Sequence, residues 1–188
     1  WNALHGGFMP SPVFGLTNAL ADHFVPILIL HMPLARLFGS PFLVIILHTL
    51  IVSSSLVLLW RLAKAISLSP NLGWLLCLLW ACNPYFHNCL FSWLYPETLP
   101  LPIFLLAITA WEKKRYDLFG FFAALLLCTK EEAGLALFAF GFSCFWIHGR
   151  RQPALILMAA SSAAFFATAH FRSWLLPSMA DGKWVAFF

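Results

Sequence analysis

The stretch LLLCTKEEAGLALFAFGF, residues 125–142, decides how the second half of the chain folds. Three consecutive charges, Lys130, Glu131 and Glu132, interrupt a run from Leu118 to Ile147 that is otherwise apolar. A helix needs about 20 apolar residues to cross a bilayer, and this run is too long for one crossing. The charges therefore predict a tight turn between two helices.

The two helices flanking this turn are expected over residues 117–129 and 133–148, and both are short. Because of this, we expect the turn to lie sunken toward the membrane. Ionisable groups at such a place cost a few kcal/mol unless they are paired or hydrated, and they are functional candidates by default. An adjacent Lys–Glu pair partly offsets that cost.

Composition places the whole chain in lipid. Of its 188 residues, 62% are hydrophobic and only 10% are charged, and the mean hydropathy is +0.85. Soluble domains carry about 25% charged residues, so this chain has too little polar surface to coat itself in water. The sequence predicts an all-α, polytopic transmembrane helical bundle that forms a single membrane domain over residues 1–188.

About six spans are expected in the apolar segments, which are residues 41–60, 72–83, 98–111, 117–129, 133–148 and 153–171. Residues 41–171 would thus hold the transmembrane helices, and residues 172–188 would begin the next extracytoplasmic segment. Residues 1–40 read as an extracytoplasmic loop. Its apolar piece FVPILILHMPLARLF is broken by Pro26 and Pro33, which indicates a short interfacial or re-entrant helix. We expect the chain to be an internal fragment of a longer membrane protein.

Basic residues are distributed unevenly among the loops. Seven of the eleven Lys and Arg fall in three short loops, as Arg61, Lys64, Lys113, Lys114, Arg115, Arg150 and Arg151. Six spans place all three loops in the cytoplasm, as the positive-inside rule requires. The net charge of +4 is therefore explained by topology in the plasma membrane, with no nucleic acid as partner. The five Cys read as free thiols, because they lie mostly inside apolar runs and show no metal-binding spacing.

The same topology puts the remaining ionisable groups on the extracytoplasmic side. There Asp22, His23, Glu97, Lys130, Glu131 and Glu132 can converge on one cavity at the outer face. Carboxylates and imidazoles together could serve as a general base, a divalent-metal site or a clamp for phosphate. None of these residues alone identifies a site. The hypothesis depends on their all lying on the same side of the membrane.

Each of these residues also has a purely structural interpretation. Glu97 can be a first-turn acid favoured by the helix dipole, and Glu131 and Glu132 can simply begin the helix that follows. Lys130 can cap the preceding helix, and His23 can pair with Asp22 in a loop. Two further features are expected to serve packing alone. His48 lies in mid-span, where an interhelical hydrogen bond is favoured over catalysis, and small residues recur at every fourth position (Ala159, Ala160, Ala163, Ala164, Ala167 and Thr168).

Three short motifs carry a resemblance to a family of bacterial and archaeal integral-membrane proteins, domain of unknown function 2079 (DUF2079). Its elements are HF-x-P, HPE-x-L-x-x-P and K-E-(D/E)-x-G-L. They correspond here to His23-Phe24-Pro26, to Tyr95-Pro96-Glu97-Thr98-Leu99-Pro102 and to Lys130-Glu131-Glu132-Gly134-Leu135. One position departs from the pattern: Tyr95 stands where the family has His. A Tyr keeps a hydroxyl donor but offers no metal-binding nitrogen.

The family in turn resembles the GT-C superfamily of polytopic glycosyltransferases. That resemblance implies transfer of sugar from a polyprenyl-phosphate donor, with acidic residues in extracytoplasmic loops and often a divalent metal. It implies catalytic or metal-binding roles for Glu97, Glu131, Glu132 and His23. Substrate-binding roles would then fall to Lys130, Asp22, Tyr95 and Arg36, with the two cations offsetting phosphate charge.

Two other classes of function stay open at this stage. A transporter or lipid-handling protein without catalysis would need polar residues along a path through the bilayer, and the sequence offers mainly His48, Ser53–Ser55 and Ser161–Ser162. A membrane scaffold would need no site at all. Because the charges gather at one face, a one-sided site is favoured over a conduit.

Overall fold

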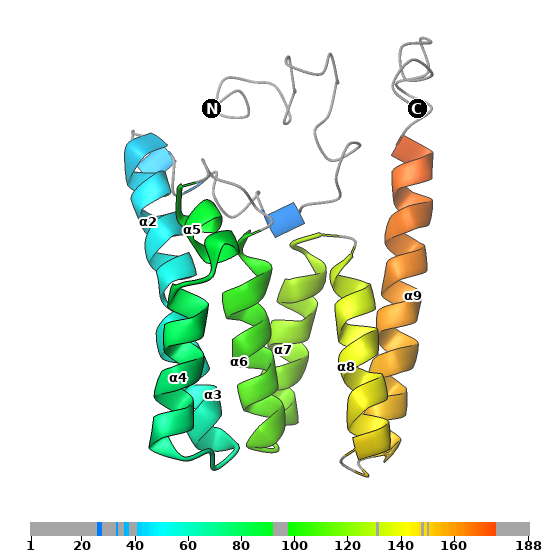
Figure 1. Ribbon diagram of the computed structural model, residues 1–188. Coiled ribbons are helices and arrows are strands. Elements are labelled where there is room, and N and C mark those ends of the chain that lie inside the picture. Colours follow the sequence, from blue (N-terminus) through cyan, green and yellow to red (C-terminus); the bar gives the residue numbers. More distant parts are fainter. Residues whose placement is uncertain are drawn as a thin grey trace. The chain divides into compact units, whose positions relative to one another are not determined.

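A computed structural model describes residues 26–27, 33, 36–37, 41–91, 98–130, 132–147, 149 and 151–175. Every regular element in these ranges is helical, and no strand occurs among them (Figure 1). The all-α prediction is thus confirmed for the described residues. Contacts divide the chain into two compact units: unit 1 comprises residues 1–26 and 130–188, and unit 2 comprises residues 27–129.

Unit 2 contains a series of helices, four of which start at a proline. The helices are α2 (Pro41–Ser53), α3 (Ser55–Ala65), α4 (Pro70–Ala81), α5 (Pro84–Phe91), α6 (Pro100–Glu112) and α7 (Tyr116–Leu127). Proline suits a first helical position because its missing N–H would be unbonded there anyway. Before α4, Ser69 Oγ accepts a hydrogen bond from the Leu72 amide at 3.4 Å, and before α5, Asn83 Oδ1 accepts one from the Tyr85 amide at 2.8 Å.

Helices α2 and α3 form one nearly continuous rod. The backbone ladder runs through the break at Ser54, whose amide donates to Leu50 O and whose carbonyl accepts from the Leu58 amide, both at 2.9 Å. The Ser54 hydroxyl also donates to Ile51 O at 2.6 Å, a bond that tends to bend a helix. This rod confirms the first apolar segment expected from the sequence.

Helices α3 and α6 end in the same way, in turns that carry basic residues. Ser67 and Lys114 adopt positive φ angles of 59° and 58°. The next amide then reaches back, from Leu68 to Ala63 O at 3.0 Å and from Arg115 to Ala110 O at 2.9 Å. This Schellman-type ending satisfies carbonyls that a helix end otherwise leaves without partners.

Helix α6 forms the core of unit 2 and packs against both α3 and α7. Its most buried large side chain is Trp111, which meets the Phe119 ring of α7 edge-on with ring centroids 4.9 Å apart. Small residues on the same helix, Ala107 and Ala110, are also buried. They let the neighbouring helices approach closely, as is usual for helix packing in membranes.

In unit 2, the α2–α3 rod and helices α4, α6 and α7 alternate in direction along the chain (Figure 1). Two helical stretches of the described residues are long and apolar enough to cross a membrane: Ile45–Ala65, with 21 residues, and Arg151–His170, with 20. Helices α4, α6, α7 and α8 are apolar but shorter. An α-helix rises 1.5 Å per residue, so they fall short of a bilayer core of about 30 Å. Two candidate spans are therefore clear, and six remain a prediction.

Unit 1 contains α8 (Ala133–Ile147) and α9 (Arg151–Leu175), which pack closely along their length. The separate helices α7 and α8 confirm the expected interruption at residues 130–132. Glycine permits the close approach of α8 to α9. A Cβ on Gly134 would lie 3.1 Å from Ser161 O, and one on Gly141 would lie 2.9 Å from Met158 Cγ.

The prediction that the small residues at every fourth position of α9 form its packing face was wrong. The face of α9 that meets α8 carries Ala154, Leu157 and Ser161, all of them buried. By contrast, Ala159, Ala160, Ala163 and Ala167 are exposed, and Ala164 and Thr168 are only partly buried. The physical reason is that a close approach needs small residues on one helix only, and the glycines of α8 already provide them.

Candidate functional site

A buried hydrogen bond ties the second sequence motif to the middle of α2. Thr98 Oγ1 and His48 Nε2 lie 2.6 Å apart, and both residues are buried, at 5% and 3% exposure. Thr98 belongs to a short 3₁₀ turn that leads into α6. The expectation that His48 makes an interhelical hydrogen bond is confirmed, and its partner is the residue that follows Glu97.

A backbone hydrogen bond brings the end of the first motif to the start of the third. The amide of Ile27, which directly follows Pro26, donates to Cys128 O at 2.9 Å. Ile27 is buried and lies in a 3₁₀ turn. Since the last carbonyls of a helix have no intrahelical partner, this amide satisfies one of them at the end of α7.

Thr129 completes the end of α7. Its hydroxyl donates to Leu126 O at 2.6 Å, and its amide donates to the same carbonyl at 2.9 Å. The side chain is fully buried. Thr129 therefore holds the chain in a fixed conformation immediately before Lys130, the first charge of the third motif.

Lys130 is largely buried for a charged residue, with 15% of its side chain exposed. Its Nζ lies 3.4 Å from Oε2 of the exposed Glu132. Glu132 also begins α8, because its carbonyl accepts from the Leu135 amide at 3.0 Å. Glu132 thus stands at the start of α8, where its structural interpretation places it, and it pairs with a lysine held mostly out of solvent. Its role in a site stays a prediction.

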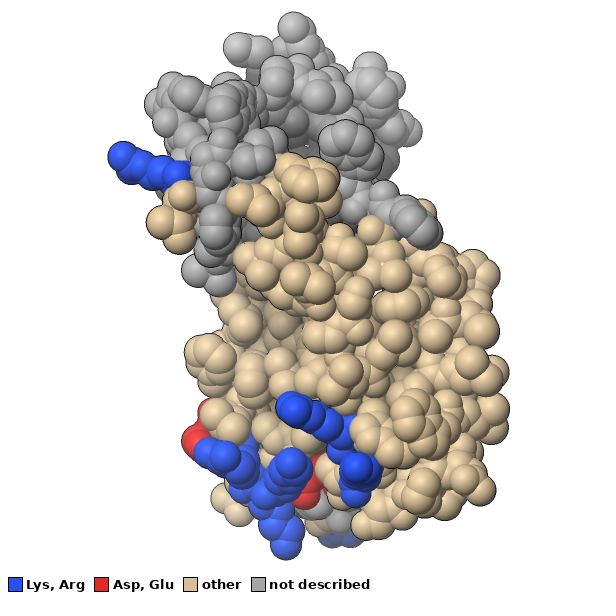
Figure 2. Space-filling model, turned by 90° about the vertical axis from the view of Figure 1, so that its left-hand side faces the viewer, with Lys and Arg blue, Asp and Glu red and all other residues tan. Residues whose placement is uncertain are grey.

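These contacts define a motif end of unit 2, made of Ile27, Thr98, Cys128 and Thr129. Helix α6 begins there and its neighbour α7 ends there (Figure 1). The opposite end of unit 2, the basic end, carries five exposed cations and two acids, Glu112 and Asp117. The cations are Arg61, Lys64, Lys113, Lys114 and Arg115. Figure 2 shows most of the Lys and Arg side chains on this face gathered at that end, with some Asp or Glu side chains among them, below a broad uncharged surface, and one Lys or Arg side chain near the top. Unit 1 has the same polarity: Lys130 and Glu132 precede α8, and Arg151 follows the turn at its other end.

Several predicted site residues lie outside the described residues: Asp22, His23, Tyr95, Glu97 and Glu131. Of the others, Arg36 lies in an exposed helical turn of unit 2, and Lys130 and Glu132 form the ion pair described above. Within the described part of the chain, no three His, Cys, Asp or Glu side chains are grouped so as to hold a metal ion. The predicted convergence of the acids therefore stays a prediction.

Sequence reasoning passed over Thr98, Thr129 and Ile27 as site residues, although Thr98 lies within a motif and the other two directly adjoin one. A signal was present for the two threonines. Each stands beside a helix boundary, where a hydroxyl can bond to free backbone groups or to a neighbouring helix. No local signal identifies Ile27, because its partner is about a hundred residues away in the chain.

Comparison with protein families gives one match that covers almost the whole chain. The family described as "Predicted membrane protein (DUF2079)" matches residues 1–187. No curated protein sequence matches the chain significantly, and no solved structure does so either.

Proposed function

The chain belongs to the DUF2079 family of predicted membrane proteins, and from this premise we propose that it is a multi-pass enzyme of the plasma membrane with a site at its extracytoplasmic face. The six passes would be the α2–α3 rod, α4, α6, α7, α8 and α9. Their alternation within each unit, with basic residues at one end, supports this topology. Short spans such as α4 are tolerated where the bilayer thins locally or flanking side chains reach out to the interface.

The reaction we propose is transfer of a sugar from a polyprenyl-phosphate donor to a hydroxyl acceptor. The observation that carries it is that residues flanking two of the motifs are bonded at the motif end of unit 2, Ile27 to Cys128, while Thr98 of the remaining motif stands at the start of α6, the helix that packs beside α7. Glu97 precedes Thr98, and Lys130 follows Thr129. A carboxylate and a cation that adjoin fixed residues are suited to act on one substrate.

The chemistry assigns complementary roles to these groups. A carboxylate, Glu97 or Glu131, takes the proton from the acceptor hydroxyl as its oxygen bonds to the anomeric carbon of the sugar. The bond from that carbon to the phosphate oxygen breaks, and the polyprenyl phosphate leaves with the electron pair. Lys130 and Arg36 stabilise the charge on the leaving phosphate. His23, Asp22, Tyr95 and Glu132 orient the substrates, and a divalent metal held by acids would supply further charge stabilisation.

The polar groups inside the helical rods favour this one-sided site over a conduit. His48 is bonded to Thr98, Ser55 Oγ accepts from Trp80 Nε1 at 3.2 Å, and Ser161 Oγ donates to Leu157 O at 2.8 Å. Side chains engaged in this way serve helix packing.

Turnover of a radiolabelled polyprenyl-phosphate sugar by the full-length protein in proteoliposomes tests the proposal. We expect Glu97→Gln or Glu131→Gln to lower turnover by a factor of about 10² or more, as loss of a general base does. Glu112→Gln, at the basic end of unit 2, is the matched control and should leave turnover unchanged. Equal turnover in all three variants and the unmodified protein would end the assignment of a base to either glutamate.

A further inference from the structure

An apolar groove runs along unit 2 between α3 and α4. Its volume is about 360 Å³, and its lining residues are Leu56, Val57, Trp60, Trp74, Cys77, Leu78 and Ala81. The volume lies at the lower end of the range for ligand pockets, about 300–1,000 Å³. Because none of these residues carries a charge and none is an amide, hydroxyl or imidazole residue, the groove suits a hydrocarbon chain and not a polar ligand.

Specific contacts hold the two walls of the groove together. On its floor, Cys77 Sγ donates to Leu56 O at 3.5 Å, and the indole rings of Trp60 and Trp74 lie with centroids 4.6 Å apart. Gly73 is needed for this arrangement, because a Cβ there would come within 2.6 Å of Trp60 Cζ3. The shape of the groove is therefore set by specific contacts between α3 and α4.

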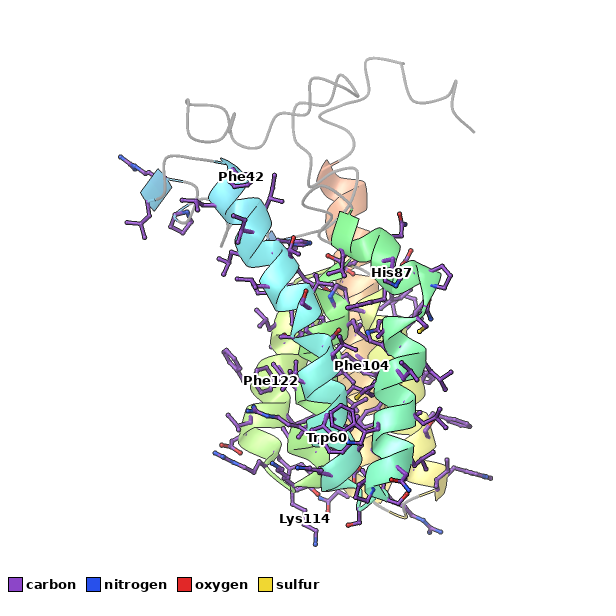
Figure 3. All side chains as sticks on the ribbon, turned by 60° about the vertical axis from the view of Figure 1, so that its left-hand side comes forward. Phe42, Trp60, His87, Phe104, Lys114 and Phe122 are labelled. Carbon is purple, nitrogen blue, oxygen red and sulfur yellow. The ribbon has the colours of Figure 1, made fainter. Side chains whose placement is uncertain are left out.

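One end of the groove is basic. Lys64 Nζ lies 5.1 Å from the centre of the Trp60 ring, and both Lys64 and Arg61 are exposed. Figure 3 shows Trp60 on the lower part of the α2–α3 rod, nearer to Lys114 than to His87. A ligand whose apolar part fills the groove would thus bring its polar head to the basic end of unit 2.

We propose that this groove binds one acyl chain of an anionic phospholipid, whose phosphate is held by Lys64 and Arg61. Cations at the rim attract an anionic headgroup by roughly 1 kcal/mol each near a membrane surface, whereas an apolar helix of a partner protein would fill the groove without using them. The headgroup would lie at the basic end of unit 2, opposite the motif end, so the lipid site is independent of the proposed sugar transfer.

Neighbouring leucines on α4 allow a matched test. Leu78 and Leu79 are each 60% exposed, but only Leu78 lines the groove. Native mass spectrometry of the full-length protein, titrated with dioleoyl phosphatidylglycerol or dioleoyl phosphatidylcholine, measures binding. We expect Leu78→Trp to weaken phosphatidylglycerol binding about tenfold or more by filling the groove, and Leu79→Trp to change it less than twofold. Equal effects of the two substitutions would overturn the groove as the site.

The contact with the lipid headgroup is tested separately. Lys64→Gln should weaken phosphatidylglycerol binding about fivefold, since one cation near the headgroup is lost, and weaken phosphatidylcholine binding less, because the choline cation offsets the charge of its phosphate. Lys113→Gln, also at the basic end but outside the groove, is the control. An unaltered preference for phosphatidylglycerol in Lys64→Gln would refute the anionic ligand. If Leu78→Trp does not fold, Val57→Trp blocks the groove from α3, where Val57 is 56% exposed.

Discussion

His48 and Thr98, which are 50 positions apart in the chain, share a buried hydrogen bond of 2.6 Å. The bond joins the middle of α2 to the turn that starts α6. Breaking a hydrogen bond between two buried polar side chains costs free energy, because each group would lose its partner in an apolar environment. It therefore fixes the position of Thr98, at the start of α6, against the α2–α3 rod.

Removing this bond is expected to destabilise the protein measurably. Thr98→Val keeps the shape of the side chain but deletes the hydroxyl, and should lower the free energy of unfolding by about 1–2 kcal/mol. Unfolding in mixed micelles with increasing sodium dodecyl sulfate measures it. Thr109→Val is the control, because that hydroxyl donates only locally, to Leu105 O at 2.7 Å. Equal losses in both variants would contradict an interhelical role for Thr98.

Two glycines should respond to the same substitution with opposite signs. At Gly141 a Cβ would meet Met158 Cγ at 2.9 Å and Ala154 O at 3.3 Å, whereas at Gly120 it would meet nothing within 4 Å. Gly141→Ala is therefore expected to cost about 1–3 kcal/mol through overpacking. Gly120→Ala should stabilise α7 by about 0.5–1 kcal/mol, the usual preference for Ala within a helix. Thermal unfolding of both variants in one detergent gives the comparison.

The helices could be predicted from sequence because their signals are local. Pro70, Pro84 and Pro100 each begin a helix as expected of proline, and the charges at residues 130–132 separate α7 from α8. The basic turns were likewise visible as clusters. These features need no knowledge of which helix lies beside which.

The partners of each helix could not be predicted, because several faces offered the same spacing. Small residues recur on α9 at Ala159, Ala163 and Ala167, yet the face in contact carries Ala154 and Ser161, since α8 supplies its own glycines. The contact between Ile27 and Cys128 depends on tertiary structure in the same way. For the candidate site, sequence identified the charge of Lys130 but not its burial, and the roles of Glu97 and Glu131 stay predictions.

Gly73 should control the geometry of the groove between α3 and α4. A Cβ there would lie 2.6 Å from Trp60 Cζ3, so Gly73→Ala must displace the indole from its place against Trp74. We expect the near-ultraviolet circular dichroism of the tryptophan pair to change and the free energy of unfolding to fall by about 1–3 kcal/mol. Asn71→Ala, at an exposed position of the same helix, should alter neither. An unchanged spectrum in Gly73→Ala would mean that the ring does not depend on this glycine.

Helix α7 offers the sharpest test of the six-pass topology, because it has only 12 residues and would rise about 18 Å. Lys114 and Glu132 lie before and after it, and both are exposed. In a protein whose native cysteines are replaced, we expect a membrane-impermeant maleimide to label Glu132→Cys in intact cells and Lys114→Cys only after permeabilisation. Arg151→Cys should behave like Lys114→Cys, since α8 separates it from Glu132. Labelling of Lys114→Cys and Glu132→Cys from the same side would mean that α7 does not cross, and the basic turns could not then share one compartment.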